Sequence, residues 1–225
     1  MCFSAQASFT AAATLSVISL LSIKKARTNG TLPLAITPLF FAIQQAAEGI
    51  VWITLATHTS SWYHYASIYS FLFFAFMWWP VWIPISLHML EKNIFRKKLL
   101  FATFIIGLLT SIYFLLNIIS YTPYAEVLSH HINYPTTSLP LGQATTITEY
   151  IQMIVYEMYL TATIFPLFFS SIPYMWILGI VIIIAFITTN ILYATTVAST
   201  WCFFAALCSI INYFIIQHYK KSSNY

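Results

Sequence analysis

The sequence from Leu39 to Trp52 reads Leu-Phe-Phe-Ala-Ile-Gln-Gln-Ala-Ala-Glu-Gly-Ile-Val-Trp, inside an apolar run over residues 32–56. A run of this length can cross a bilayer, because about 20 helical residues span the hydrocarbon core. Glu48 interrupts the run, and a carboxylate at membrane depth costs about 3 kcal/mol on insertion scales. We therefore expect Glu48 to face the protein interior or a wet cavity. There it is either functional or a protonated group that only hydrogen-bonds neighbouring helices.

Two glutamines and a tryptophan accompany this carboxylate. Gln45 and Trp52 lie three residues before and four residues after Glu48, and Gln44 lies four residues before it. Residues three, four or seven apart share one face of a helix. The spacing predicts a polar face that carries two amides and a carboxylate within the membrane.

The composition is that of an integral membrane protein. Of 225 residues, 60% are hydrophobic and 6% are charged, whereas about a quarter of a soluble domain is charged. No apolar-poor segment exceeds about 30 residues, so we expect one membrane domain over residues 1–225 and no separate soluble domain. The net charge of +4 is interpreted through membrane topology, and we expect no nucleic-acid partner.

Seven apolar runs predict an all-α, polytopic protein with seven transmembrane helices in one bundle. We expect these helices near residues 8–23, 32–56, 67–90, 99–120, 151–169, 173–193 and 199–218. Pro80 and Pro84 are expected to kink or locally unwind the third of them. One long connection remains, over residues 121–150, and loops of this length in compact proteins are usually functional or disordered.

The basic residues predict the orientation. All nine Lys and Arg residues fall after the first helix, after the third helix or in the C-terminal tail, which are alternate ends of a seven-helix chain. The positive-inside rule places these ends in the cytoplasm, so the N-terminus and the 121–150 loop are expected outside. No basic residue precedes the first run and three follow it, so we expect this run to be a retained helix and not a cleaved signal peptide.

This topology brings together thiol, imidazole and carboxylate groups in the outer leaflet: Cys2, Glu48, His130, His131 and Cys202. Cys, His and Glu are ligands for zinc, copper or iron, so Cys2, Glu48 and one of the adjacent histidines could bind a metal. The same groups could instead form a catalytic site in which a histidine activates Cys2 or Cys202. A third alternative is a Cys2–Cys202 disulfide, or two free thiols.

Several known chemistries are not supported by the sequence. No lysine lies within a predicted helix, so a retinal Schiff base is not available. A Pro-Gln dipeptide of the kind typical of seven-helix sugar and lysosomal transporters, a Gly-rich phosphate loop and a His-Glu-x-x-His zinc motif are also absent.

The opening Met1-Cys2-Phe3-Ser4-Ala5 resembles the start of an uncharacterised family of bacterial integral membrane proteins. The resemblance extends to the following residues: Gln45, Glu48, Trp52, Pro80, Pro84, His130, His131, Ile132, Tyr134, Tyr159, Thr163, Ser170, Ser171, Trp201, Cys202, Ala205 and Ala206. The chain departs at Gln44, where a histidine is common in that family. The resemblance implies a protein of the bacterial cytoplasmic membrane in which Cys2, Glu48, His131 and Cys202 belong to the family pattern, whereas Glu157 does not obviously do so.

Three functional hypotheses follow. In the first, the protein is a membrane-embedded enzyme or a metal- or redox-binding protein whose outer site contains Cys2, Glu48, His131 and Cys202. In the second, it is a sensor or transporter of a small molecule that uses Gln44, Gln45 and Glu48 in a cavity. Trp52 and Tyr134 are further candidate binding residues. The third is a structural membrane subunit. Against transport, the sequence shows no inverted repeat and no matched pair of broken helices. The lipid bilayer is the one partner that the sequence establishes, and the oligomeric state stays open.

Overall fold

The computed structural model describes residues 4–26, 31–120, 122–128, 130–135 and 146–222. Its elements, in order, are α1 (Ala5–Lys25), α2 (Leu32–Ala56), α3 (Trp62–Leu72), the π-helix η1 (Phe73–Trp78), α4 (Trp79–Leu90), α5 (Ile94–Ser120), β1 (Glu126–Leu128), β2 (His131–Asn133), α6 (Ile147–Phe169), α7 (Met175–Leu192), α8 (Val197–Cys208) and α9 (Ile211–Ser222). The segments α3, η1 and α4 form one span, as do α8 and α9, and within the described ranges seven helices are long and apolar enough to cross a membrane. The predicted all-α class and the number of spans are confirmed.

Several boundaries differ from the prediction. The third, fourth and fifth spans begin earlier, at Trp62, Ile94 and Glu149. At α6 the reason is a capping box, in which the Thr146 hydroxyl accepts the Glu149 N–H and the Glu149 carboxylate accepts the Thr146 N–H. Such caps satisfy N–H groups that have no partner in the first turn of a helix, so they set where it starts.

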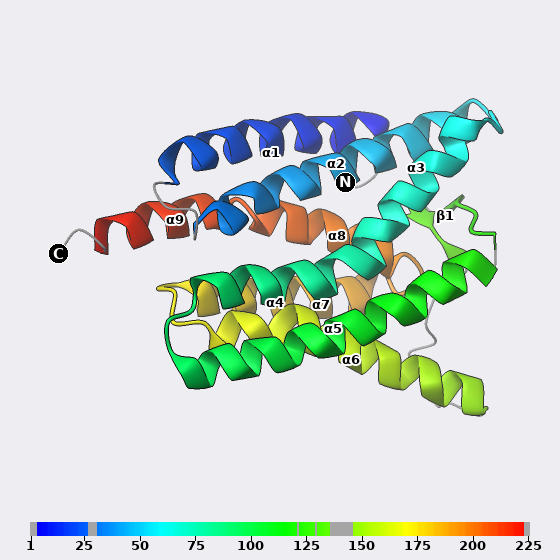
Figure 1. Cartoon of the computed structure of the whole chain (residues 1–225). Helices are drawn as coiled ribbons and strands as arrows, with labels where there is room; N and C mark the ends of the chain where they lie inside the picture. The colour runs from blue at the N-terminus through cyan, green and yellow to red at the C-terminus, as the bar shows by residue number, and fades with distance from the viewer. Residues whose placement is uncertain (1–3, 27–30, 121, 129, 136–145, 223–225) are drawn as a thin grey trace.

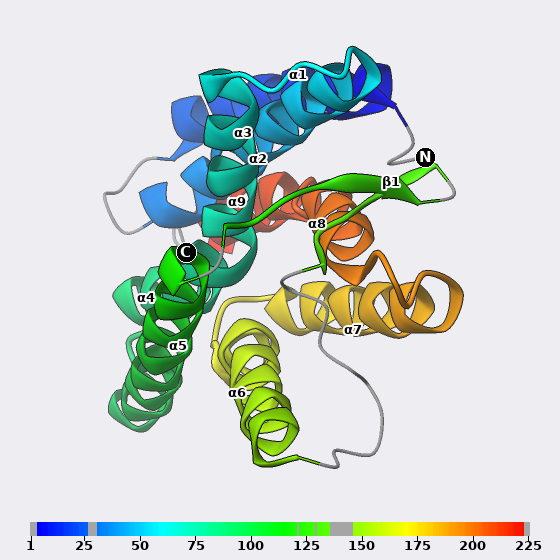
Figure 2. The same ribbon diagram turned by 90° about the vertical axis from the view of Figure 1, so that its right-hand side faces the viewer.

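The 121–150 loop contains a short hairpin that was not predicted. Strands β1 and β2 pair antiparallel, with Val127 opposite Ile132. Each strand has three residues, too few for an alternating pattern to stand out in the sequence. The hairpin lies across one end of the bundle (Figure 2).

The third span is distorted as its prolines predict. In the π-helix register, the Trp79 N–H bonds to the Phe74 carbonyl five residues back. The next residue in that register is Pro80, which has no N–H to offer Ala75. The Tyr159 hydroxyl donates to the Ala75 carbonyl instead, at 2.6 Å, and so joins α6 to this span. Ser111 likewise donates to the Met77 carbonyl at 2.7 Å.

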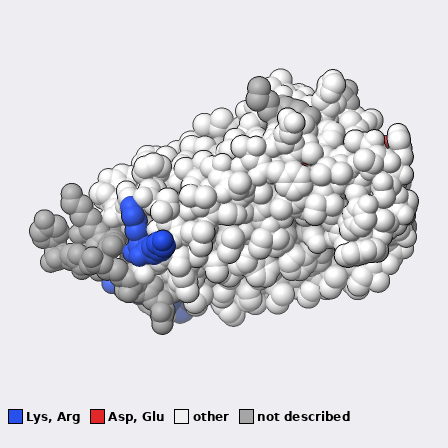
Figure 3. Space-filling view, turned by 90° about the horizontal axis from the view of Figure 1, so that it is seen from above, with Lys and Arg blue, Asp and Glu red and all other residues white. Residues whose placement is uncertain are grey.

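The bundle has two chemically different ends. The described Lys and Arg residues lie at the end of α1, at the α4–α5 connection and in α9, and these places share one end of the molecule (Figure 1). Figure 3 shows the same gathering on the face seen from above. The hairpin lies at the opposite end. This arrangement agrees with the charge pattern from which the orientation was predicted.

Glu91 connects two turns at the basic end. Its carboxylate accepts the N–H groups of Lys92 (3.0 Å) and Asn93 (2.9 Å), and the N–H (2.7 Å) and hydroxyl of Ser171, which follows α6. Burial raises the pKa of Glu91, but the hydrogen bonds from Ser171, Asn93 and Lys92 outweigh it and hold the pKa below its usual value.

The stabilisation by Glu91 is therefore expected to depend on pH. A carboxyl group whose pKa is lower in the folded state stabilises the fold above its unfolded pKa, and this contribution is lost as the pH falls through the folded pKa. Lowering the pH from about 5 to about 3 should reduce the unfolding temperature of the unmodified protein more than that of Glu91→Gln, measured in detergent. Glu126→Gln, at the other end of the bundle, is the control. An equal loss of stability in Glu91→Gln would contradict this role.

Candidate functional site

Glu48 lies at the centre of a fully buried polar cluster. The side chains of Gln44, Gln45 and Glu48 on α2 and of Ser199 on α8 have no exposed surface. The Ser199 hydroxyl donates to Oε1 of Glu48. The expected burial of Glu48, with a hydrogen-bonding partner, is therefore confirmed. The partner comes from a helix about 150 residues away in sequence, which gathers polar groups from two distant spans at one point.

The two glutamines lie on either side of this carboxyl. The Gln44 side-chain oxygen accepts a hydrogen bond from Trp79 Nε1 at 2.9 Å, and its amide lies beside the Cys202 thiol. The Gln45 amide lies next to the Glu48 carboxyl, but neither its oxygen nor its nitrogen is aligned for a hydrogen bond. Leaving a buried polar group without a hydrogen bond costs about 1–3 kcal/mol. The cluster therefore holds hydrogen-bonding capacity that these residues do not use among themselves.

Tyr134 and Cys202 complete the cluster. Tyr134 follows β2, is 2% exposed and stacks on Phe71 with ring centroids 4.8 Å apart. Burial raises its pKa well above the usual value, and the nearby Glu48 and Cys202 raise it further. Its phenol thus stays protonated. Cys202 is buried and carries a free thiol, which argues against the alternative of a disulfide at this residue.

The adjacent histidines lie in different parts of the hairpin, His130 in the turn and His131 at the start of β2. His131 is 8% exposed, and its ring lies 4.7 Å from that of Tyr193. His130 is exposed, in the turn, with a φ of 67°. That one histidine of the pair binds a metal and the other does not stays a prediction; of the two, His130 is the exposed residue. Trp52 packs half-buried against the core, and its indole nitrogen has no hydrogen bond among the described residues.

The metal-binding hypothesis depends on a residue outside the described part of the chain. Cys2 lies there, so its predicted approach to His131 and Cys202 stays a prediction. Within the described ranges, no group of three or more His, Cys, Asp or Glu side chains is placed to hold a metal ion. Glu48 and Cys202 alone would be too few ligands for zinc, which takes at least three from a protein.

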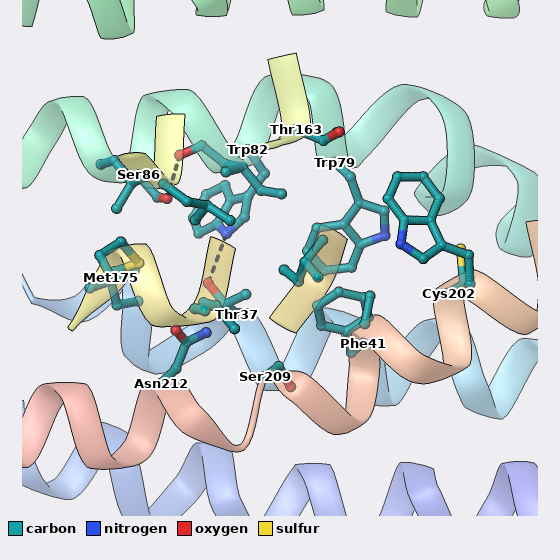
Figure 4. Close-up of a pocket in the computed structure, with 18 of the residues that line it drawn as sticks. Thr37, Phe41, Trp79, Trp82, Ser86, Thr163, Met175, Cys202, Ser209 and Asn212 are labelled. Atoms are coloured by element: carbon teal, nitrogen blue, oxygen red, sulfur yellow. Dashed lines mark hydrogen bonds between the residues drawn. The ribbon is translucent and has the colours of Figure 1, made fainter. Parts of the chain in front are cut away.

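Two cavities meet at Tyr159, Trp201 and Cys202. The first extends from Cys202 toward Asn212 on α9 and offers about 60 Å³ to the centres of water-sized molecules (Figure 4). The second, of the same size, lies under the hairpin and includes Tyr134 in its wall. Each cavity is therefore large enough to hold water or a small molecule. Of the predicted ligand-binding residues, only Tyr134 lines one of these two cavities, whereas Gln44, Gln45, Trp52 and Glu48 line neither. Cys202, which lies near Glu48, lines both.

The first cavity is mostly apolar but has unused polar groups. Its polar wall residues are Thr37, Ser86, Tyr159, Thr163, Ser209 and Asn212. Trp82 Nε1 donates to Thr37 at 3.0 Å, whereas the buried Trp201 Nε1 and Asn212 Oδ1 have no hydrogen bond among the described residues. Figure 4 places Asn212 and Cys202 at opposite sides of this cavity. The cavity thus offers a donor from Trp201 and an acceptor from Asn212.

Two interrupted spans form walls of the first cavity. The third is interrupted by the π-helix before Trp79. The seventh, predicted over 199–218, is one span over Val197–His218, with a turn at Ser209 and Ile210 between α8 and α9. At this turn, the Ser209 hydroxyl donates to the Ala206 carbonyl, and the N–H groups of Ile210 and Asn212 bond three residues back. These shorter bonds end the α-helix.

Sequence reasoning found one side of the site and missed the other. The helical spacing of Gln44, Gln45 and Glu48 was a sufficient signal for the α2 face. Ser199 and Trp79 were missed, because a serine and a tryptophan in apolar runs are common and only the crossing of α2 with α8 and α4 gives them their partners.

The chain was compared with protein families, with curated proteins and with solved structures. Neither the curated proteins nor the solved structures contain a match to the chain. A family model described as a family of unknown function (DUF6629) matches residues 1–224. The expectation of a family without an assigned activity is confirmed over almost the entire sequence, and the chain belongs to the family of unknown function DUF6629.

Proposed function

We propose that the protein binds a small, largely apolar molecule inside its helix bundle, as a sensor or transporter of the bacterial cytoplasmic membrane. The observation that carries this proposal is that the buried cluster of Gln44, Gln45 and Glu48 adjoins Cys202, the residue that lines both cavities. Small-molecule sites in proteins are concave and mostly apolar, with a few convergent polar groups that fix orientation.

The unused polar atoms support a ligand with hydrogen-bonding groups. Around Cys202, the Gln44 amide nitrogen and Trp201 Nε1 lack partners among the described residues, and Asn212 Oδ1 lacks one at the far side. A ligand that accepts a hydrogen bond from Trp201 Nε1 and donates one to Asn212 Oδ1 would offset the cost of leaving these two atoms unpaired. Gln44, Gln45 and Glu48 lie behind Cys202 and would act on a ligand through that residue, while Tyr134 forms part of the wall of the second cavity beneath the hairpin.

The orientation of the site follows from the charges. The basic end of the bundle faces the cytoplasm by the positive-inside rule, with the N-terminus and the hairpin outside and the C-terminus inside. The second cavity then lies on the outer side of Trp201 and the first on its inner side. Two interrupted spans beside the inner cavity favour a bundle that can move around a ligand.

A metal- or thiol-centred outer site is the second candidate. Its support is that a carboxyl group and a free thiol, Glu48 and Cys202, lie in one buried cluster. It requires Cys2 or His131 as a further participant, with zinc, copper or iron as the candidate metal.

Brominated short-chain alcohols are a suitable probe, because bromine quenches indole fluorescence and Trp79, Trp82 and Trp201 line the first cavity. We expect saturable quenching in the purified protein. Ala205→Leu adds bulk to the wall of this cavity and should weaken the probe at least tenfold. The matched control, Ile184→Leu, changes a side chain that is 58% exposed and should leave the affinity unchanged. Quenching that rises linearly and equally in all three proteins would contradict the proposal.

A further inference from the structure

A second feature of the bundle, unrelated to the cavities, is an exposed carboxylate within a membrane span. Glu157 lies eight residues after Glu149, where the fifth span begins, and is therefore about 12 Å along the helix. Its side chain is exposed, and it makes no hydrogen bond or ion pair among the residues that the structure describes. An isolated carboxylate facing lipid at this depth is costly, so such groups are normally paired.

Glu157 lines a groove between α5 and α6. The groove offers about 260 Å³ to water-sized molecules, and its other walls are apolar or weakly polar: Ile106, Met153, Ile154, Met158 and Thr161. The first half of α6 also presents large apolar side chains outward, including Ile147, Tyr150 and Ile154, which are 79%, 53% and 60% exposed. This half of α6 extends away from the rest of the bundle (Figures 1 and 2).

We propose that this groove binds a transmembrane helix of another protein, one that carries a Lys or Arg side chain at the depth of Glu157. A cation in the groove would pair with the carboxylate, while the remainder of the helix would pack on Ile154, Met158 and Ile106. Interhelical contacts of this kind, between a polar pair and adjacent side chains, stabilise helix association in membranes.

A second copy of this chain does not fit the same requirement. In the sequence, all nine Lys and Arg residues follow the first or third span or lie in the C-terminal tail, and the eight that the structure describes are at one end of the bundle. A parallel copy could therefore bring only another carboxylate or a hydroxyl to Glu157, not a cation. A lipid headgroup is also excluded by depth, because its charge lies at the membrane surface, about 12 Å away along the helix.

The probe is a synthetic transmembrane helix of leucine and alanine with one lysine about 12 Å from its outer end. Its association with the full-length protein is measured by energy transfer between fluorophores in bilayer vesicles. We expect Glu157→Gln to weaken binding at least tenfold, which corresponds to about 1.4 kcal/mol. Thr161→Trp, which fills the groove and keeps the carboxylate, should weaken it similarly.

Two controls isolate the charge and its depth. Glu126→Gln, which removes a carboxylate from the hairpin, should bind the probe as the unmodified protein does. Helices with leucine in place of the lysine, or with the lysine at the other end, should bind weakly and equally to all variants. Equal binding of the lysine helix to Glu157→Gln would overturn the proposal. So would association between copies of the protein that Glu157→Gln abolishes when no helix is added.

Discussion

Replacing Gly107 by alanine is expected to destabilise the protein by about 3 kcal/mol, the upper end of the usual cost of overpacking a core. A Cβ atom at this position would lie 1.9 Å from the carbonyl oxygen of Pro80 and 2.6 Å from its carbon. Both atoms belong to a helix backbone, which cannot rotate away as a side chain can. The substitution would therefore force α5 away from α4.

The matched control is Gly179→Ala. There a Cβ would meet the far end of the Phe168 ring at 2.8 Å, and a ring can shift at low cost. The test is the fraction of each protein that stays folded after heating in detergent, with Gly107→Ala expected to unfold at a clearly lower temperature than Gly179→Ala. Equal temperatures for the two variants would show that the α4–α5 crossing is not tight.

The physical reason for this close approach is proline chemistry. Pro84 has no N–H, so it cannot bond to the Pro80 carbonyl four residues back. That carbonyl faces Gly107, whose lack of a side chain permits close contact of the two backbones. Small residues at such crossings let membrane helices pack closely, and Cα–H groups can make weak hydrogen bonds to carbonyl oxygens. The prolines thus determine which residue of α5 must be glycine.

The sequence could predict the distortion but not this contact. Pro80 and Pro84 indicate a weakened helix by themselves, because each lacks an N–H wherever it is placed. Which helix covers the freed carbonyls depends on the packing of α4 against α5 and α6, which no local pattern encodes. The turn at Ser209 was missed for the opposite reason: no proline or glycine marks it, and the apolar run continues through it.

The candidate site also has a part that the sequence could predict and a part that it could not. Gln44, Gln45 and Glu48 share a helix face by spacing alone, so their common burial was predictable. The order of the spans also placed Cys202 in the same leaflet as these residues. The first cavity, however, is bounded by side chains from several spans, such as Thr37, Thr163 and Asn212, and its existence depends on how completely those side chains fill the interior.

Replacing Glu48 by leucine is expected to destabilise the protein by about 1–3 kcal/mol, whereas glutamine should be tolerated with a loss of less than about 1 kcal/mol. Leucine cannot accept the Ser199 hydroxyl, and it would leave that hydroxyl in a fully buried place without a partner. Glutamine keeps an acceptor oxygen at nearly the same position. The measurement is the unfolding temperature in detergent, together with binding of the brominated alcohol probe.

A double-mutant cycle with Ser199→Ala separates the hydrogen bond from simple packing. If the cost of Glu48→Leu arises from the stranded hydroxyl, then Ser199→Ala should lower that cost, because both polar partners are then absent. Purely additive losses would assign the effect to side-chain shape instead. If Glu48→Gln is as damaging as Glu48→Leu, then the cluster requires a carboxyl group and not just an acceptor. That outcome would favour a catalytic or metal-binding role for Glu48 over ligand recognition by a neutral hydrogen-bonding cluster.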